Sequence, residues 1–112
     1  MRVVHSDDLT ETEVSHNALL KKKVLVGKGE IENMVYFSRA VFPPGEIAGA
    51  HSHDDMTEVF FVESGEGQAE VDGRCINLPP GSCLTVEPNE SHEIKNTGAE
   101  DLVLLYFGVK AE

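Results

Sequence analysis

The sequence has 112 residues, a length typical of one domain and too short for two ordinary ones. Hydrophobic residues make up 40% and charged residues 26%, which excludes a disordered or membrane-spanning chain. The formal net charge of −11 repels phosphate backbones and anionic lipids, so we predict neither nucleic acid nor a membrane as a partner. The N-terminus lacks the apolar segment of a secretory signal, and we therefore expect a cytoplasmic protein.

Short β-rich segments alternate with turn signals along the whole chain, without repeats or linkers. The expected strands cover residues 18–26, 33–42, a segment around 51–53, 57–63, 68–71, 74–78, 82–86, 91–96 and 102–107. A single helical turn is expected within residues 7–14, and we interpret residues 1–17 as an arm or a strand that pairs with a partner. This spacing is typical of an all-β sandwich or barrel and predicts one domain over residues 1–112.

Turn residues and cysteines add local detail to this prediction. Asp72 and Gly73 separate two expected strands, and this dipeptide favours a hairpin in which both residues take positive φ. Cys75 and Cys83 flank a proline-rich turn, where they could face each other, and their apolar surroundings predict buried thiols. Neither cysteine belongs to a C-x-x-C pair, so a zinc–thiolate site is not expected.

Two expected strands are apolar on both of their faces. They cover residues 59–62 and 102–107. A strand covered on both sides in so small a protein indicates a second layer or a second subunit. We therefore predict a homodimer formed through an apolar sheet face.

The segment 45–65 contains the most specific pattern of the chain. Gly45 is followed by five residues, His51-x-His53, four residues, Glu58, six residues and Gly65. Residues i and i+2 of a strand point to the same face, so the two histidines are expected to project side by side.

A second unit begins at Gly81 and continues with Glu87, Asn89, His92 and Asn96. The two units resemble the paired motifs of the cupin superfamily, G-x5-H-x-H-x4-E-x6-G and G-x5-P-x-G-x2-H-x3-N. The first motif fits at every position, whereas Glu87 replaces the usual proline of the second motif and Asn89 its inner glycine. Asparagine replaces glycine well at positive φ, so we expect the loop before His92 to be kept.

The resemblance implies a cupin jelly-roll β-barrel, also called a double-stranded β-helix, as a single domain. The 15 residues between the motifs make the chain similar to small single-domain microbial cupins. Cupins of the germin and oxalate decarboxylase type bind a metal through three histidines and one glutamate. The resemblance therefore implies His51, His53, Glu58 and His92 as ligands. Some cupins hold the metal by three histidines alone, so Glu58 could also leave the metal and serve as a base.

The chemistry of this donor set agrees with such a site. Three imidazoles and a carboxylate suit one divalent transition metal per chain, namely Mn, Fe, Ni, Cu or Zn. Four protein ligands leave one or two positions for water or substrate, as in a catalytic or ligand-exchanging site. The two histidines outside the motifs, His5 and His16, are expected to be surface or hydrogen-bonded residues.

The remaining inward side chains should decide the ligand. By strand parity the candidates for the pocket lining are Tyr36 or Phe37, Arg39, Met56, Phe60 and Tyr106. They predict a mostly apolar pocket for a small organic molecule. A metal-dependent enzyme is the first hypothesis, with a dioxygenase as the first choice and a lyase or isomerase as alternatives. The second hypothesis is a module that binds metal and a metabolite without turnover, and the third is a purely structural barrel.

Overall fold

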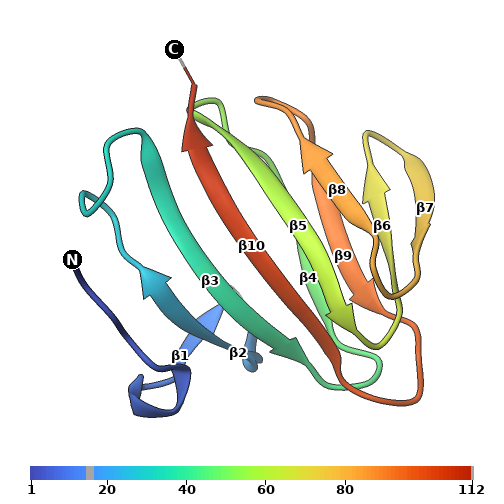
Figure 1. Cartoon of the computed structure of the whole chain (residues 1–112). Helices are drawn as coiled ribbons and strands as arrows, with labels where there is room; N and C mark the ends of the chain where they lie inside the picture. Colours follow the sequence, from blue (N-terminus) through green and yellow to red (C-terminus); the bar gives the residue numbers. More distant parts are fainter. Residues whose placement is uncertain (15–16, 112) are drawn as a thin grey trace.

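Two antiparallel sheets packed face to face make up the computed structural model, which describes residues 1–14 and 17–111 (Figure 1). The six-stranded sheet has the order β1-β2-β3-β10-β5-β8, formed by Thr12–Val14, Asn17–Val26, Met34–Phe42, Leu102–Lys110, Met56–Ser64 and Cys83–Val86. The four-stranded sheet has the order β4-β9-β6-β7, formed by Ile47–His51, His92–Asn96, Gly67–Val71 and Arg74–Leu78.

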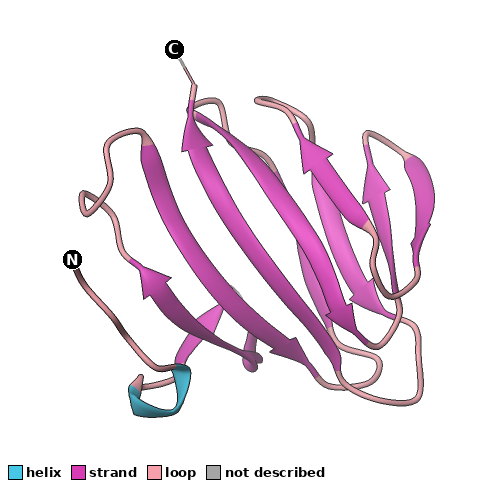
Figure 2. Cartoon of the chain, in the orientation of Figure 1, coloured by secondary structure: helices cyan, strands magenta, loops and turns pink. Residues whose placement is uncertain are grey.

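The chain crosses between the sheets at every connection from β3 to β10 except the β6–β7 hairpin. This alternation gives the jelly-roll topology that the resemblance to cupins implied. Strands dominate the ribbon (Figure 2). Of residues 7–14, where a helical turn was expected, only Asp7 and Asp8 belong to a 3-10 turn, η1 (Ser6–Asp8), and Thr12–Val14 form a strand instead. No helix among residues 1–14 and 17–111 is long and apolar enough to span a membrane.

The N-terminal segment joins the larger sheet of its own chain. β1 pairs antiparallel with β2, and β2 pairs with β3. Thr12–Val14 therefore pair within the sheet of their own chain, and the interpretation of residues 1–17 as an arm or a strand that pairs with a partner stays a prediction. His5 is an exposed residue that accepts a hydrogen bond from the backbone of Asp7, whereas His16 lies outside the described residues.

Residues with positive φ form the turns that the sequence predicted. Asp72 and Gly73 have φ of 46° and 84°, as a type I′ hairpin between β6 and β7 requires. Gly45, Gly65 and Gly81 also have positive φ. At Gly65 a side chain would overlap the carbonyl oxygen of the β9–β10 connection, so glycine is required there for space as well as for conformation.

The core lies between the sheets and follows strand alternation. Its buried members include Leu20, Ala40, Phe42, Phe60, Val62, Ala69, Ile94, Leu102 and Leu104. Asn96 is buried beside them and donates hydrogen bonds to the carbonyls of Phe42 and Glu100, at 2.8 and 2.7 Å. Its own side-chain oxygen accepts from Gly98, so Asn96 stabilises the loop between β9 and β10.

The prediction of buried thiols was wrong. Cys75 lies opposite Glu70 on the outer face of the smaller sheet, and Cys83 lies opposite Phe61 on the outer face of the larger one. Both cysteines are exposed. Because β7 and β8 belong to different sheets, the two thiols do not face each other across the turn.

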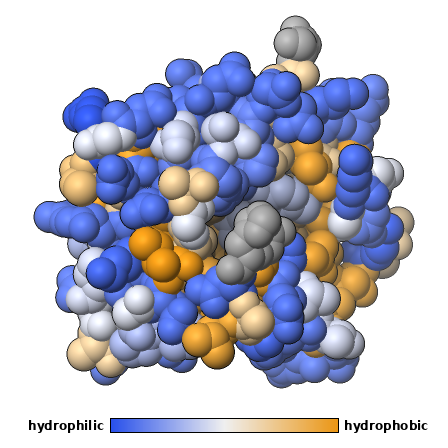
Figure 3. Space-filling view, turned by 180° about the vertical axis from the view of Figure 1, so that it is seen from behind, coloured by the Kyte–Doolittle hydropathy of each residue, from blue (hydrophilic) through white to orange (hydrophobic). Residues whose placement is uncertain are grey.

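The outer face of the six-stranded sheet carries cross-strand apolar rows. Phe37, Phe107 and Val59 are register neighbours across β3, β10 and β5, and Leu105 lies beside Phe61 in the next row. No described element lies in front of these strands (Figure 1), and Phe61 is 41% exposed. Seen from behind, the molecule is mainly hydrophilic with separate apolar patches (Figure 3). The smaller sheet is therefore the second layer on the inner face of these strands, no element within residues 1–14 and 17–111 covers their outer face, and a second subunit there stays a prediction.

Candidate metal centre

Four residues of the cupin-like motifs come together at one end of the space between the sheets. His51 ends β4 and His92 begins β9, and the two are register partners across these strands. Glu58 is the third residue of β5, in the opposite sheet. His53 lies in the loop after β4, so the expectation that one strand carries both histidines was wrong. The His51 and His53 rings nevertheless lie 4.9 Å apart between centroids.

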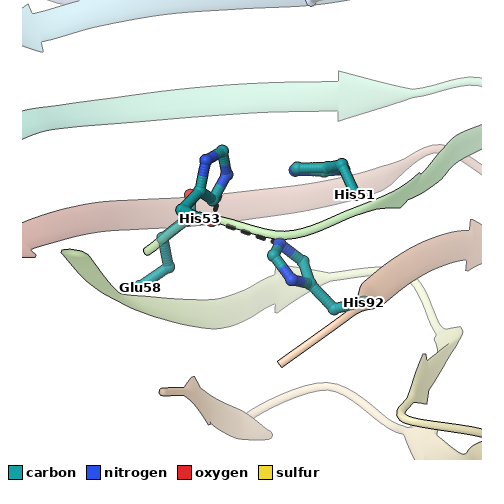
Figure 4. A group of neighbouring side chains, drawn as sticks. All are labelled: His51, His53, Glu58 and His92. Carbon is teal, nitrogen blue, oxygen red and sulfur yellow. Dashed lines mark ion pairs between the residues drawn. The ribbon is translucent and has the colours of Figure 1, made fainter. Parts of the chain in front are cut away.

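The donor atoms of these residues converge on a single point. One donor atom from each of the four lies within 4.8 Å of the others. The Nε2 atoms of His53 and His92 are each 3.1 Å from Glu58 Oε1, and both rings point toward that carboxylate (Figure 4). The sequence therefore identified a real cluster, and its compactness fits ligands that share one ion.

Backbone carbonyls fix the tautomers of two rings. His51 Nδ1 lies 2.8 Å from the Gly49 carbonyl oxygen, and His92 Nδ1 lies 3.1 Å from that of Glu90. A carbonyl only accepts hydrogen bonds, so each Nδ1 carries the proton in the neutral ring. Both Nε2 lone pairs are then free to bind a metal, which is the usual arrangement of ligating histidines.

Two buried atoms of the cluster have no aligned hydrogen-bond partner in the described chain, namely Glu58 Oε1 and His92 Nε2. The 3.1 Å between them is an ion-pair distance without the direction of a hydrogen bond. A buried carboxylate oxygen is costly unless it is paired or coordinates a metal. The residues present therefore fit a divalent cation, which would contact both atoms at once.

Burial and charge shift the two inner histidines in opposite directions. Burial lowers the pKa of His53, and the neighbouring His51 and His92 lower it further. Burial alone would also lower the pKa of His92, but the facing Glu58 carboxylate and the Glu90 carbonyl raise it overall. Glu58 therefore favours protonation of His92 over protonation of His53.

The second oxygen of Glu58 is held by a tyrosine from a neighbouring strand. The Tyr36 hydroxyl donates a hydrogen bond to Glu58 Oε2. Gly108 is the register partner of both Tyr36 and Glu58, and its missing side chain leaves the gap across which the hydroxyl reaches. Glu58 thus keeps one oxygen for Tyr36 and the other for the histidine cluster.

A second tyrosine closes the apolar side of the centre. Tyr106 stacks on Phe60 at 5.6 Å and meets Tyr36 edge-on at 5.3 Å between ring centroids. Burial, followed by the negative charge of Glu58, raises the pKa of Tyr106 to about 12. Its hydroxyl therefore stays neutral and can donate a hydrogen bond at any physiological pH.

The cluster forms part of the wall of a two-part cavity. An inner chamber of about 70 Å³ is mostly apolar and is lined by Ala40, Phe42, Phe60, Ile94, Leu104 and Tyr106, besides His51, Glu58 and His92. An outer chamber of about 410 Å³ leads from it and adds Lys22, Tyr36, Ser52, His53 and Met56. The inner volume is far below that of a drug-sized pocket, so it admits only a very small molecule.

Four of the predicted pocket residues line this cavity, namely Tyr36, Met56, Phe60 and Tyr106. Arg39 and the alternative Phe37 lie on the outer face of β3 instead. Arg39 forms an ion pair with Glu63 there, at 3.0 Å. The pocket is thus as apolar as predicted but lacks the expected arginine.

The sequence interpretation missed the contributions of β1, β2 and the start of β4. Val14 and Ala48 line both chambers, and Lys22 lines the outer one. Leu20, two residues before Lys22, is buried and marks the inner face of β2. Strand parity counted from Leu20 is the signal that identifies Lys22.

The departures from the second motif are accommodated as predicted. Asn89 has φ of 71°, in the region where glycine is usual. Its N–H donates a 2.6 Å hydrogen bond to the carbonyl of His53, which fastens the loop that carries this ligand. At the proline position, the Glu87 N–H donates to the Glu90 side chain at 2.7 Å.

Comparison with known proteins agrees with this architecture. The Cupin domain family matches residues 38–108, which include both motifs. The chain belongs to this family.

Individual relatives include an oxalate-binding protein of Thermotoga maritima, 33% identical over 95 residues, or 85% of this chain and 73% of that protein. The crystal structure of a predicted oxalate decarboxylase from Thermotoga maritima superposes with a TM-score of 0.90 at 27% identity, covering 98% of this chain and all of that one. The polyketide cyclase RemF of Streptomyces resistomycificus has a TM-score of 0.81 at 15% identity, covering 100% of this chain and 82% of that one, a likeness of fold alone.

Proposed function

We propose that the protein is a metal-dependent cupin that binds a small carboxylic acid, with oxalate as the first candidate. The observation that carries the proposal is the cluster of four donor atoms within 4.8 Å, two of them buried without an aligned partner in the described chain. The name of the Thermotoga maritima relative supports oxalate as the ligand.

His51, His53, Glu58 and His92 would hold one divalent ion, and Mn, Fe, Ni, Cu and Zn all suit this donor set. When bound, such an ion supplies a Lewis acid and an attachment point for ligand oxygens. Tyr36 keeps Glu58 oriented, and the backbone carbonyls of Gly49 and Glu90 keep two imidazoles in the binding tautomer. The apolar inner chamber excludes water around the ligand and limits its size.

Metal and oxalate titrations test this proposal directly. The metal-loaded protein should bind oxalate with a stoichiometry of about one per chain in isothermal titration calorimetry, and the metal-free protein should not. A variant with His51→Ala and His53→Ala should lose its metal on dialysis. Stoichiometric metal in that double variant would overturn the assignment of the site.

A metal-dependent enzyme is the second candidate, with a dioxygenase acting on a small organic metabolite as its first form. The hydrogen bond from Tyr36 to Glu58 favours it, because it places a proton donor beside a carboxylate that can act as a base. Oxygen uptake by the iron-loaded protein, offered small carboxylic acids one at a time, is the measurement. If the protein bound a ligand but consumed no oxygen and formed no product, the dioxygenase would be excluded. Binding without turnover would then remain as the function.

We further propose that the protein is a homodimer located in the cytoplasm. The dimer is supported by the apolar rows on the outer face of β3, β10 and β5, which no described element covers. This face lies on the far side of the sheet from the metal centre, so pairing would leave the cavity open.

A further inference from the structure

Lys22 is a cationic residue on the inner face of β2. Its register partner is Ala40, which is 1% exposed and lines the inner chamber. Leu20, on the same face of β2, is completely buried. The Lys22 side chain is half-buried and forms part of the wall of the outer chamber.

The neighbouring lysines are placed differently. The Lys21 Nζ lies 3.8 Å from Glu13 Oε1, and the Lys23 Nζ donates a 2.8 Å hydrogen bond to the Ser6 carbonyl. Within residues 1–14 and 17–111, the Lys22 ammonium has neither an ion pair nor a hydrogen bond. Of the three consecutive lysines, Lys22 is therefore the one that lines the cavity, and its ammonium is unpaired within the part of the chain that the structure describes.

The surroundings of Lys22 belong to the metal centre. The same outer chamber is lined by Tyr36, His51, His53 and Glu58. Among the described residues of both chambers, Lys22 is the only lysine or arginine. In a chain with a net charge of −11, a lone ammonium at the mouth of this cavity is a local attraction for anions.

We propose that Lys22 binds the outer carboxylate of a dicarboxylate ligand whose other carboxylate meets the metal centre, and that it thereby selects dicarboxylates over monocarboxylates. This inference rests on the proposed function. A divalent ion held by three neutral imidazoles and Glu58 has one net positive charge, and Lys22 adds another. A small dicarboxylate, with two negative charges, neutralises both.

A purely structural role for Lys22 gives a different expectation. A lysine can cover apolar surface with its methylene stem while its ammonium stays in water. In that case the unbranched side chain of a methionine would cover the same apolar surface equally well. The substitution Lys22→Met separates the two roles because it keeps an unbranched apolar stem and removes only the charge.

The experiment compares oxalate and acetate binding to metal-loaded wild type, Lys22→Met and Lys22→Arg by calorimetry. Lys22→Met should weaken oxalate binding by about tenfold or more, because a hydrogen bond to a charged partner is lost. It should leave acetate affinity and metal content within about twofold of wild type, and Lys22→Arg should restore much of the oxalate affinity. Lys21→Met is the matched control, since it removes the same charge from the outer face of the same strand, and it should bind both acids like wild type.

Equal oxalate affinity in wild type and Lys22→Met would overturn the role of Lys22 and leave the proposed function intact. Metal-loaded wild type that binds neither oxalate nor acetate would overturn the proposed function, and the role of Lys22 with it. If Lys22→Met lost affinity for oxalate and for acetate by the same factor, Lys22 would attract anions in general. That result would contradict the selection of dicarboxylates. Melting temperatures of the metal-free variants show whether each variant is folded. Recovery of oxalate affinity in Lys22→Arg shows that the loss in Lys22→Met comes from the missing charge and not from misfolding.

Discussion

Glu58 depends on Tyr36 for its orientation, because the Tyr36 hydroxyl holds the carboxylate oxygen that faces away from the histidines. We expect Tyr36→Phe to lower metal affinity by about tenfold, the lower end of the usual effect of losing a group that supports a ligand. Competition with a chromophoric chelator measures it. Tyr106→Phe is the control: it also removes a cavity hydroxyl, but this one is not hydrogen-bonded to Glu58. Equal affinities in wild type and Tyr36→Phe would contradict the orienting role.

Tyr106 should titrate far above an ordinary tyrosine. Burial and the charge of Glu58 raise its pKa to about 12. The chain has two tyrosines, so in Tyr36→Phe the absorbance of tyrosinate reports Tyr106 alone. Because the folded-state pKa is raised, the folded protein loses stability as pH rises from the ordinary value of about 10 toward 12. A midpoint near 10 in the folded, metal-free protein would show that Tyr106 is not buried beside an ionised Glu58.

Residue identity was easier to predict than residue direction. The spacing of the two motifs identified the cluster of His51, His53, Glu58 and His92, because this spacing does not depend on where each strand begins and ends. Tyr36 and Arg39 could not both face the pocket, since residues three apart in an unbroken strand point to opposite faces. Apolar residues on both faces of that strand concealed which side was inward. The three consecutive lysines concealed the inward direction of Lys22 in the same way, because they place a lysine on both faces of their strand.

At the level of elements, the turn between β5 and β6 has a stricter requirement than the turn before β8. Gly65 and Gly81 have φ of 77° and 88°, but only at Gly65 would a side chain meet backbone, with Leu102 Cα at 2.9 Å. We expect Gly81→Ala to destabilise the fold by about 1–2 kcal/mol, through conformation alone. Gly65→Ala should cost about 3 kcal/mol or more, since the close approach adds to it. Urea unfolding measures both, and equal costs would contradict the close contact.

Most strands were predictable, whereas β1, the strand ends and the sheet to which each strand belongs were not. β4 ends at His51, and its pairing with β9 shifts register between Ala48 and His51, a tertiary feature without a local signal. The cysteines were misplaced for a related reason. An apolar stretch predicts a strand, but which of its faces is inward depends on the partner sheet. The hairpin at Asp72 and Gly73 was predicted correctly, because the positive φ of both turn residues depends on local sequence.

For the whole molecule, metal binding should couple stability to pH. In the metal-free protein the two shifted histidines oppose each other. The lowered pKa of His53 costs stability as pH falls, whereas the raised pKa of His92 gives stability that is lost as pH rises. Metal requires both rings neutral, so protons compete with it below about pH 6.5.

We therefore expect excess metal to raise the melting temperature at pH 7.5, by the equivalent of about 2.7 kcal/mol at one hundred times its dissociation constant. This increment should disappear by about pH 5. Differential scanning calorimetry with and without metal measures it. The variant with His51→Ala and His53→Ala is the control and should show no increment at either pH. An increment that persists unchanged at pH 5 would mean that the ligands are not histidines.

The apolar rows on β3, β10 and β5 lead to the prediction for the assembly. Phe61 and Val109 are 41% and 39% exposed at either end of this face, and Phe37, Val59, Leu105 and Phe107 lie between them, half-buried. Contiguous apolar surface of this kind marks an interface in most proteins. The Arg39–Glu63 ion pair at its edge gives the face a polar rim, as interfaces commonly have.

Sedimentation velocity at micromolar concentration should therefore show a dimer of the 12.2 kDa chain. Phe61→Glu should convert it to a monomer, because pairing would bury two carboxylates against apolar side chains. Ile31→Glu is the matched control, since Ile31 is a 48% exposed apolar residue in the β2–β3 connection, away from the rows. Metal content should be the same in all three proteins, because the rows and the centre lie on opposite faces of the sheet. A wild-type protein that sediments only as the 12.2 kDa species would refute the dimer and leave these rows as solvent-exposed surface.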